Sequence, residues 1–154
     1  MIKYTQISES NEKETRSLNH SYICAELMRQ FFQDSTLQPL PELTLDIENG
    51  LTPDICIYKK DKVRPNFFED ILKIKEMPLL VVEVISSNQS VNINIVLEKS
   101  KTLLKAGIKA VWIVEPYGHS VFVLNKEGKQ LFHQTIVECD GIKVDFDKIF
   151  SGFR

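Results

Sequence analysis

The sequence contains no apolar stretch long enough to cross a bilayer, and residues 1–19 lack the apolar core of a signal peptide. Cysteine is scarce, with Cys24, Cys56 and Cys139 far apart and forming neither a CxxC motif nor a Cys/His cluster. A disulfide framework and a zinc site are therefore not expected. These absences predict a protein of the reducing cytoplasm with no membrane association.

The chain also lacks an excess of either charge. Its 19 Lys and Arg residues nearly balance 21 Asp and Glu residues, for a formal net charge of -2. Strong non-specific binding to nucleic acid is therefore not predicted by composition. Basic residues gather locally at Lys59, Lys60, Lys62 and Arg64, with acids between and after them. From charge alone, a solvated loop is the favoured interpretation, and a phosphate-binding surface is the alternative.

What the chain does have is the composition of a globular domain. Hydrophobic residues make up 43% and charged residues 26% of its 154 positions. A chain of this length buries roughly two-thirds of its unfolded surface on folding. We therefore expect one domain over residues 1–154, with residues 1–15 as a flexible or extended N-terminal segment.

Hydrophobic periodicity predicts alternating helices and strands. A helix is expected over 17–33, a strand over 42–47 after a proline-bounded entry, and a turn at Asn49-Gly50 leading to a strand that starts at Asp54. Residues 65–77 are expected to form a flap with a short helical piece. We expect a right-handed crossover made of a strand around Glu83, a helix over 91–106 and a strand over 110–115. This connection makes the two strands parallel neighbours. Antiparallel strands over 120–124, 130–134 and 135–137 and a short helix within 142–150 complete an α/β (α+β) domain, a mixed sheet flanked by helices.

Two of the apolar strands each contain one acid. Strand alternation puts Asp54 on the same face as Cys56 and Tyr58. It likewise puts Glu83 on the same face as Val81 and Ile85. A carboxylate in such a position costs several kcal/mol of desolvation unless a cation or hydrogen-bond donors compensate it. If the strands pair, the two carboxylates converge, which indicates a site for a divalent metal.

Metal-dependent phosphodiester hydrolysis also needs a cation that stabilises developing negative charge. In a Glu-x-Lys strand the lysine would stand two residues after Glu83, where this chain has Ile85. The following helix offers Lys99 and Lys101, which flank opposite sides of its apolar stripe. Both alternatives, a site lysine and an ordinary solvated lysine, stay open for each of them.

His20 precedes Ile23 and Cys24 by about one helical turn, so its side chain should face the protein. A histidine at the edge of the core with a backbone partner is the favoured interpretation from the sequence alone, and a functional histidine is the alternative.

Several motifs occur together in a fixed order: Pro53-Asp54, the run from Leu80 to Ser86, Glu98-Lys99, Ala106-Gly107 and Trp112-Ile113-Val114-Glu115-Pro116. In this set the chain resembles the Uma-two family of proposed restriction endonucleases, within the PD-(D/E)XK nuclease superfamily. The resemblance covers residues 20–150, and each motif alone would be weak.

The resemblance implies a restriction-endonuclease-like fold and a DNA endonuclease that uses Mg²⁺ or Mn²⁺. It assigns Asp54 and Glu83 as catalytic metal ligands, the Val84 carbonyl as a further ligand, and Lys99 as the catalytic lysine moved onto the helix. It also places His20 and Ser86 beside the site. Since cutting both strands of DNA takes two such sites, a homodimer is expected.

The chain departs from the family pattern at two places, and the first of these, together with the mild negative charge, favours an alternative. Members of the family commonly have an Asp shortly before the helix lysine, whereas this chain reads Asn92-Ile93-Asn94-Ile95 there, with no acid before Glu98, and Ser87 replaces the usual proline. The alternative function is an inactive nuclease-like domain that binds nucleic acid or a partner protein. A small-molecule hydrolase has little support, because no glycine-rich phosphate loop or GxSxG motif is present.

Overall fold

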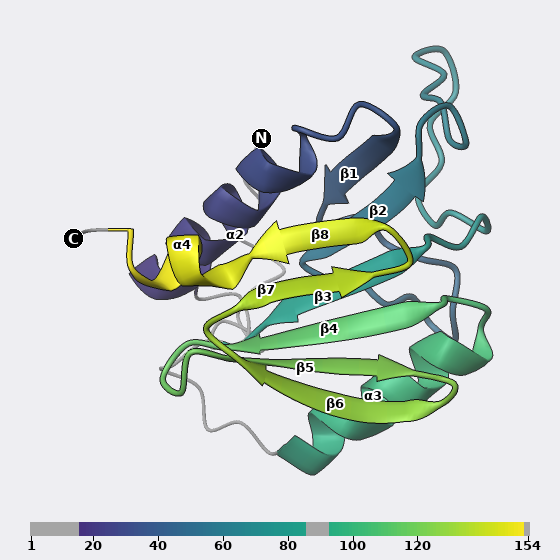
Figure 1. Cartoon of the computed structure of the whole chain (residues 1–154). Helices are drawn as coiled ribbons and strands as arrows, with labels where there is room; N and C mark the ends of the chain where they lie inside the picture. Colours follow the sequence, from purple (N-terminus) through teal and green to yellow (C-terminus); the bar gives the residue numbers. More distant parts are fainter. Residues whose placement is uncertain (1–15, 86–92, 153–154) are drawn as a thin grey trace.

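A computed structural model describes residues 16–85 and 93–152. Figure 1 shows a mixed sheet with a helix on each face. In chain order the elements are α2 (Leu18–Phe31), β1 (Leu37–Pro41), β2 (Ile55–Lys59), β3 (Leu80–Val84), α3 (Ile93–Lys105), β4 (Ala110–Glu115), β5 (Ser120–Asn125), β6 (Gly128–His133), β7 (Ile136–Cys139), β8 (Ile142–Asp145) and α4 (Phe146–Phe150). The expected segment 1–15 and Ser86 lie outside the described residues.

The six-stranded sheet has the order β1-β2-β3-β4-β5-β6. The strands β3 and β4 are parallel, as the crossover predicted, and the other pairs in this sheet are antiparallel. A second, two-stranded sheet of β7 and β8 was not predicted. The expected α/β class, a mixed sheet flanked by helices, is confirmed.

Strand alternation divides the core into two layers. Ile55, Ile57 and Val82 pack with α2, β7, β8 and α4, whereas Cys56, Tyr58 and Val81 pack with α3. In Figure 1, α2 and the yellow C-terminal elements lie on one side of the sheet and α3 on the other. The predicted shared face is confirmed for Cys56, Tyr58 and Val81, and each helix covers one face. It is wrong for Asp54, which precedes β2 and contacts His20 of α2 on the opposite side.

The strand expected over 42–47 is wrong. The partner of β2 is the earlier segment Leu37–Pro41, and Leu45 makes only isolated bridges with Leu51 and Ile74. The Glu42 N–H donates to the Asp54 carbonyl on the β2 side, so the alternate positions Pro39 and Pro41 face the open edge of the sheet. An edge strand tolerates proline there because no N–H is needed.

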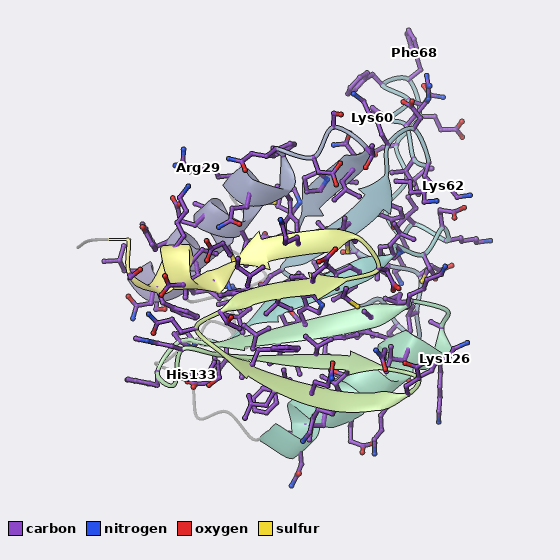
Figure 2. The ribbon with its side chains drawn as sticks, in the orientation of Figure 1. Arg29, Lys60, Lys62, Phe68, Lys126 and His133 are labelled. Carbon is purple, nitrogen blue, oxygen red and sulfur yellow. The ribbon has the colours of Figure 1, made fainter. Side chains whose placement is uncertain are left out.

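The loop between β2 and β3 contains turns and bends over residues 65–77, so the short helical piece expected there is wrong. Val63, Ile74 and Met77 at its base pack against the α3-side core, and the Tyr58 hydroxyl donates to the Glu76 carbonyl at 2.7 Å. Figure 2 shows Phe68 at the tip, pointing away from the body of the protein. The base of the loop thus covers one face, as a flap should, while its tip stays in solvent.

Candidate active site

The pairing of β2 and β3 ends at Ile55 and Val82, and two acidic side chains continue it beyond that point. The Asp54 N–H donates to Glu83 Oε1 at 3.1 Å, and the Val84 N–H donates to Asp54 Oδ2 at 2.8 Å. Each carboxylate is thereby fixed by the backbone of the opposite strand. This reciprocal arrangement brings Asp54 and Glu83 together at the strand ends, as the predicted pairing of their strands implied.

The Val84 carbonyl faces the same side. The Ile85 N–H donates to the Val114 carbonyl of β4, whereas the Val84 N–H points to Asp54. Because the N–H and C=O of one strand residue point to the same neighbouring strand, the Val84 carbonyl is directed toward the β2 side. Two carboxylates and a carbonyl form an oxygen donor set of the kind that Mg²⁺ and Mn²⁺ prefer.

On the α2 side, His20 lies in the first turn of the helix, whose N-cap Ser17 accepts the His20 N–H at 3.1 Å. The ring Nε2 lies 3.1 Å from Asp54 Oδ2, and the two side chains are only 7% and 10% exposed. The ring Nδ1 lies 3.9 Å from Cys24 Sγ. The described ring contacts of His20 are therefore side chains of the site, and the backbone partner favoured from the sequence is wrong.

On the α3 side, Lys99 Nζ lies 2.6 Å from Glu83 Oε2. Ile85, at the position of a Glu-x-Lys lysine, packs against the α3-side core instead. Lys101 pairs with Glu98 at 3.1 Å, and its side chain is 65% exposed. Of the two candidate lysines, the structure brings Lys99 to the carboxylates and leaves Lys101 on the exposed surface.

The two carboxylates differ in their electrostatics. Burial is the largest influence on Asp54 and raises its pKa, but hydrogen bonds from His20 and the Val84 N–H outweigh it, so the pKa of Asp54 is lowered. Burial also dominates at Glu83, where the charge of Asp54 adds to it and Lys99 opposes it, and the pKa of Glu83 is raised. A divalent cation between them would favour the ionised form of both groups.

A cavity of about 170 Å³ opens on the α2 side of Asp54. Its lining includes Arg16, His20, Cys24 and Glu42, and the positive charge of Arg16 contributes to the lowered pKa of Asp54. Burial and the negative charges of Asp54 and Glu42 raise the pKa of the Cys24 thiol to about 12.

Sequence reasoning missed two neighbours of the site. The prediction that the cysteines form no Cys/His cluster is wrong for Cys24. Its spacing of four residues from His20 on one helix places the two side chains on the same face. That spacing is the signal that would have found Cys24. Glu42 carries no such signal, because it leaves β1 with a positive φ of 50° in a segment expected to be a regular strand.

Among residues 16–85 and 93–152, no helix has the length and apolar character to cross a membrane.

A six-stranded mixed sheet with a helix on each face, and acids at two adjacent strand ends, define the class as a restriction-endonuclease-like α/β domain. The chain belongs to the Uma2 family, described as "Putative restriction endonuclease", whose model matches residues 11–151.

One similar solved structure is a protein from Anabaena variabilis, described as "a putative nuclease belonging to DUF820". It shares 19% sequence identity with this chain at a TM-score of 0.73, and the match covers 89% of this chain and 83% of that one. At this identity, the likeness supports the fold. No curated protein matches the chain.

Proposed function

We propose that this protein is a metal-dependent DNA endonuclease, with Mg²⁺ or Mn²⁺ held by Asp54, Glu83 and the Val84 carbonyl. The observation that carries this proposal is the reciprocal anchoring of the two carboxylates, with the Lys99 amine 2.6 Å from Glu83. The family membership supports the same reaction class.

Each residue has a distinct role in this proposal. A bound divalent ion supplies Lewis acidity toward the phosphate and lowers the pKa of water. Asp54 and Glu83 bind that ion, and their backbone hydrogen bonds keep both carboxylates oriented before DNA arrives. Lys99 orients the attacking water and stabilises negative charge that develops on the phosphate. His20 is a positioning residue, because it acts on Asp54 from the α2 side.

The test is single-turnover cleavage of plasmid DNA by purified protein with Mg²⁺ or Mn²⁺. We expect cleavage that EDTA abolishes and that Asp54→Asn lowers by at least about 100-fold. Both substitutions Asp54→Asn and Glu83→Gln should also weaken Mn²⁺ binding measured by calorimetry. A protein that cuts no DNA, and whose metal binding is the same in both variants, would show that the assigned site is wrong.

A second candidate is the inactive nuclease-like module. It is favoured by the Asn92-Ile93-Asn94 sequence before the helix lysine, where an acid is usual. For this alternative we expect DNA binding in a mobility-shift assay that is unaffected by Asp54→Asn, together with no cleavage in any metal.

Double-strand cleavage takes two sites, and we therefore infer a homodimer in the reducing cytoplasm, where the three cysteines would stay as free thiols. Size-exclusion chromatography with light-scattering detection measures the mass of the protein in solution directly. A monomer that nicks one strand but does not linearise plasmid DNA would contradict the dimer and leave the reaction intact.

A further inference from the structure

Asp54 has a second set of metal-binding neighbours on the side away from Lys99. Ligand atoms of His20, Cys24 and Asp54 all lie within 4.8 Å of one another. His20 and Cys24 project from successive turns of α2, and Asp54 comes from the sheet. The three side chains thus combine two donors from one helix with one from a separate element, which fixes their relative positions.

These donors differ chemically from the oxygen set between the strands. Mg²⁺ takes oxygen ligands, whereas an imidazole nitrogen and a thiolate sulfur select borderline ions such as Zn²⁺ and Co²⁺. The adjoining cavity of about 170 Å³ leaves room for an ion together with a water molecule as a fourth ligand. Both the ligand types and the available space therefore fit a tetrahedral ion.

From this we infer that His20, Cys24 and Asp54 form a binding site for a borderline divalent transition-metal ion, with Zn²⁺ as the representative. The ion replaces the thiol proton of Cys24, which passes to the buffer, and no oxidation or reduction is involved. Cys24 approaches Nδ1 of His20 and Asp54 approaches Nε2, so an ion would bind one of these nitrogens, and side-chain rotation would have to bring the other donors to it. One ligand atom of each residue already lies within 4.8 Å of the others.

Occupation of this site would affect the oxygen-lined site, because both use Asp54. An ion held on the α2 side takes a carboxylate that the proposed nuclease needs for Mg²⁺, so Zn²⁺ would inhibit cleavage. This consequence rests on the proposed function, whereas the binding itself does not. Cys24→Ser should relieve the inhibition while His20, Asp54 and Glu83 remain in place.

The direct test is titration of the untagged, full-length protein with Co²⁺, followed by absorption spectroscopy. A cysteine thiolate bound to Co²⁺ gives a charge-transfer band in the near ultraviolet, and tetrahedral Co²⁺ gives intense visible bands. We expect both at one ion per chain, with loss of the visible bands when Zn²⁺ is added. Cys24→Ser should abolish the charge-transfer band and weaken Co²⁺ binding by at least about tenfold.

Cys139→Ser is the matched control, since Cys139 is also a half-buried free cysteine but lies on β7. Its bands should equal those of the wild type, and Glu83→Gln should keep them too because Glu83 serves the other site. The inference fails if the bands are absent in the wild type, persist in Cys24→Ser or disappear in Cys139→Ser.

His20→Gln gives a second, independent variant in case Cys24→Ser disturbs folding, which circular dichroism would show. It should retain the thiolate band only weakly and bind Co²⁺ less tightly; unchanged binding would overturn the inference. If the protein shows the Co²⁺ bands but cuts no DNA, the inferred metal site stands and the proposed nuclease function is wrong. If it cuts DNA but shows no Co²⁺ band, the nuclease function stands and the inferred metal site is wrong.

Discussion

The two faces of the sheet supply different chemistry to the same pair of strand ends. On the α2 face, Asp54 contacts His20 near the half-buried Cys24, and the side chains of Asp54 and His20 are largely shielded from water. On the α3 face, Glu83 contacts Lys99, whose side chain is 35% exposed. The pKa of Asp54 is lowered and that of Glu83 is raised. Two helices on opposite faces thus give two adjacent carboxylates different electrostatic environments.

The largest expected effect tests whether the α3 face carries the catalytic cation. Lys99→Met should lower the single-turnover cleavage rate by about 100-fold, because charge developing on the phosphate loses its stabilisation. Lys101→Met is the matched control on the same helix and should stay within about twofold of the wild type, since its exposed ion pair contributes little. Equal losses in the two variants would remove the distinction between these lysines.

A second prediction compares the stability of the two carboxylates. At pH 7, Asp54→Asn should lower the free energy of unfolding by about 2 kcal/mol, because the charged acceptor of two hydrogen bonds is lost. Glu83→Gln should instead raise it slightly, since the buried charge of Glu83 is disfavoured by desolvation and by Asp54. Urea denaturation measures both. If both substitutions changed the free energy of unfolding in the same direction, the two carboxylates would not have the different environments described for them.

The pH dependence sharpens that comparison. The lowered pKa of Asp54 gives stability that is present above its ordinary value of 3.8 and is lost as pH falls through the folded-state pKa. The raised pKa of Glu83 has the opposite sign, since its contribution is present below 4.5 and is lost as pH rises through the folded-state pKa.

The free energy of unfolding of Glu83→Gln should therefore increasingly exceed that of the wild type between about pH 4 and pH 7. The amount by which that of Asp54→Asn falls below the wild type should shrink below about pH 4. Unfolding free energies at several pH values test this. A constant difference across that range would contradict the assignment of either shift.

The smallest expected effect is stabilisation by metal. At a Mg²⁺ concentration roughly ten times Kd, the wild-type Tm should rise by about 3 °C, because only the folded protein presents both carboxylates. Glu83→Gln should lose most of the rise, and EDTA should reverse it in the wild type. A full shift in Glu83→Gln would place the ion elsewhere.

The sequence was most informative where local pattern and tertiary context agree. The β4 strand was predicted at its observed bounds, because its uninterrupted apolar run suits a strand buried on both faces. The proximity of Asp54 and Glu83 was predicted from the pairing of their strands, although alternation failed for Asp54, which precedes β2 and contacts His20 on the α2 side. Lys99 and Lys101 could not be separated in this way, because the reach of a long side chain depends on where the whole helix packs.

Elsewhere, tertiary context overrode the local signal. The prolines at 39 and 41 argued against a strand over 37–41, yet an edge position removes the need for their missing N–H groups. Cys24 was treated as an isolated cysteine, although its neighbour His20 lies one helical turn away. Its third partner, Asp54, is separated by 30 residues and meets it only after folding, so no sequence pattern could have supplied it.

The prolines of β1 also bear on how two copies of the protein can associate. At the outer edge of β1, Pro39 and Pro41 offer no N–H to an incoming strand, whose carbonyls would be left without donors. A dimer that extends the sheet across β1 is therefore disfavoured, as is open-ended strand addition at this edge. Two copies that act on opposite strands of one duplex would have to meet through other surfaces of the domain.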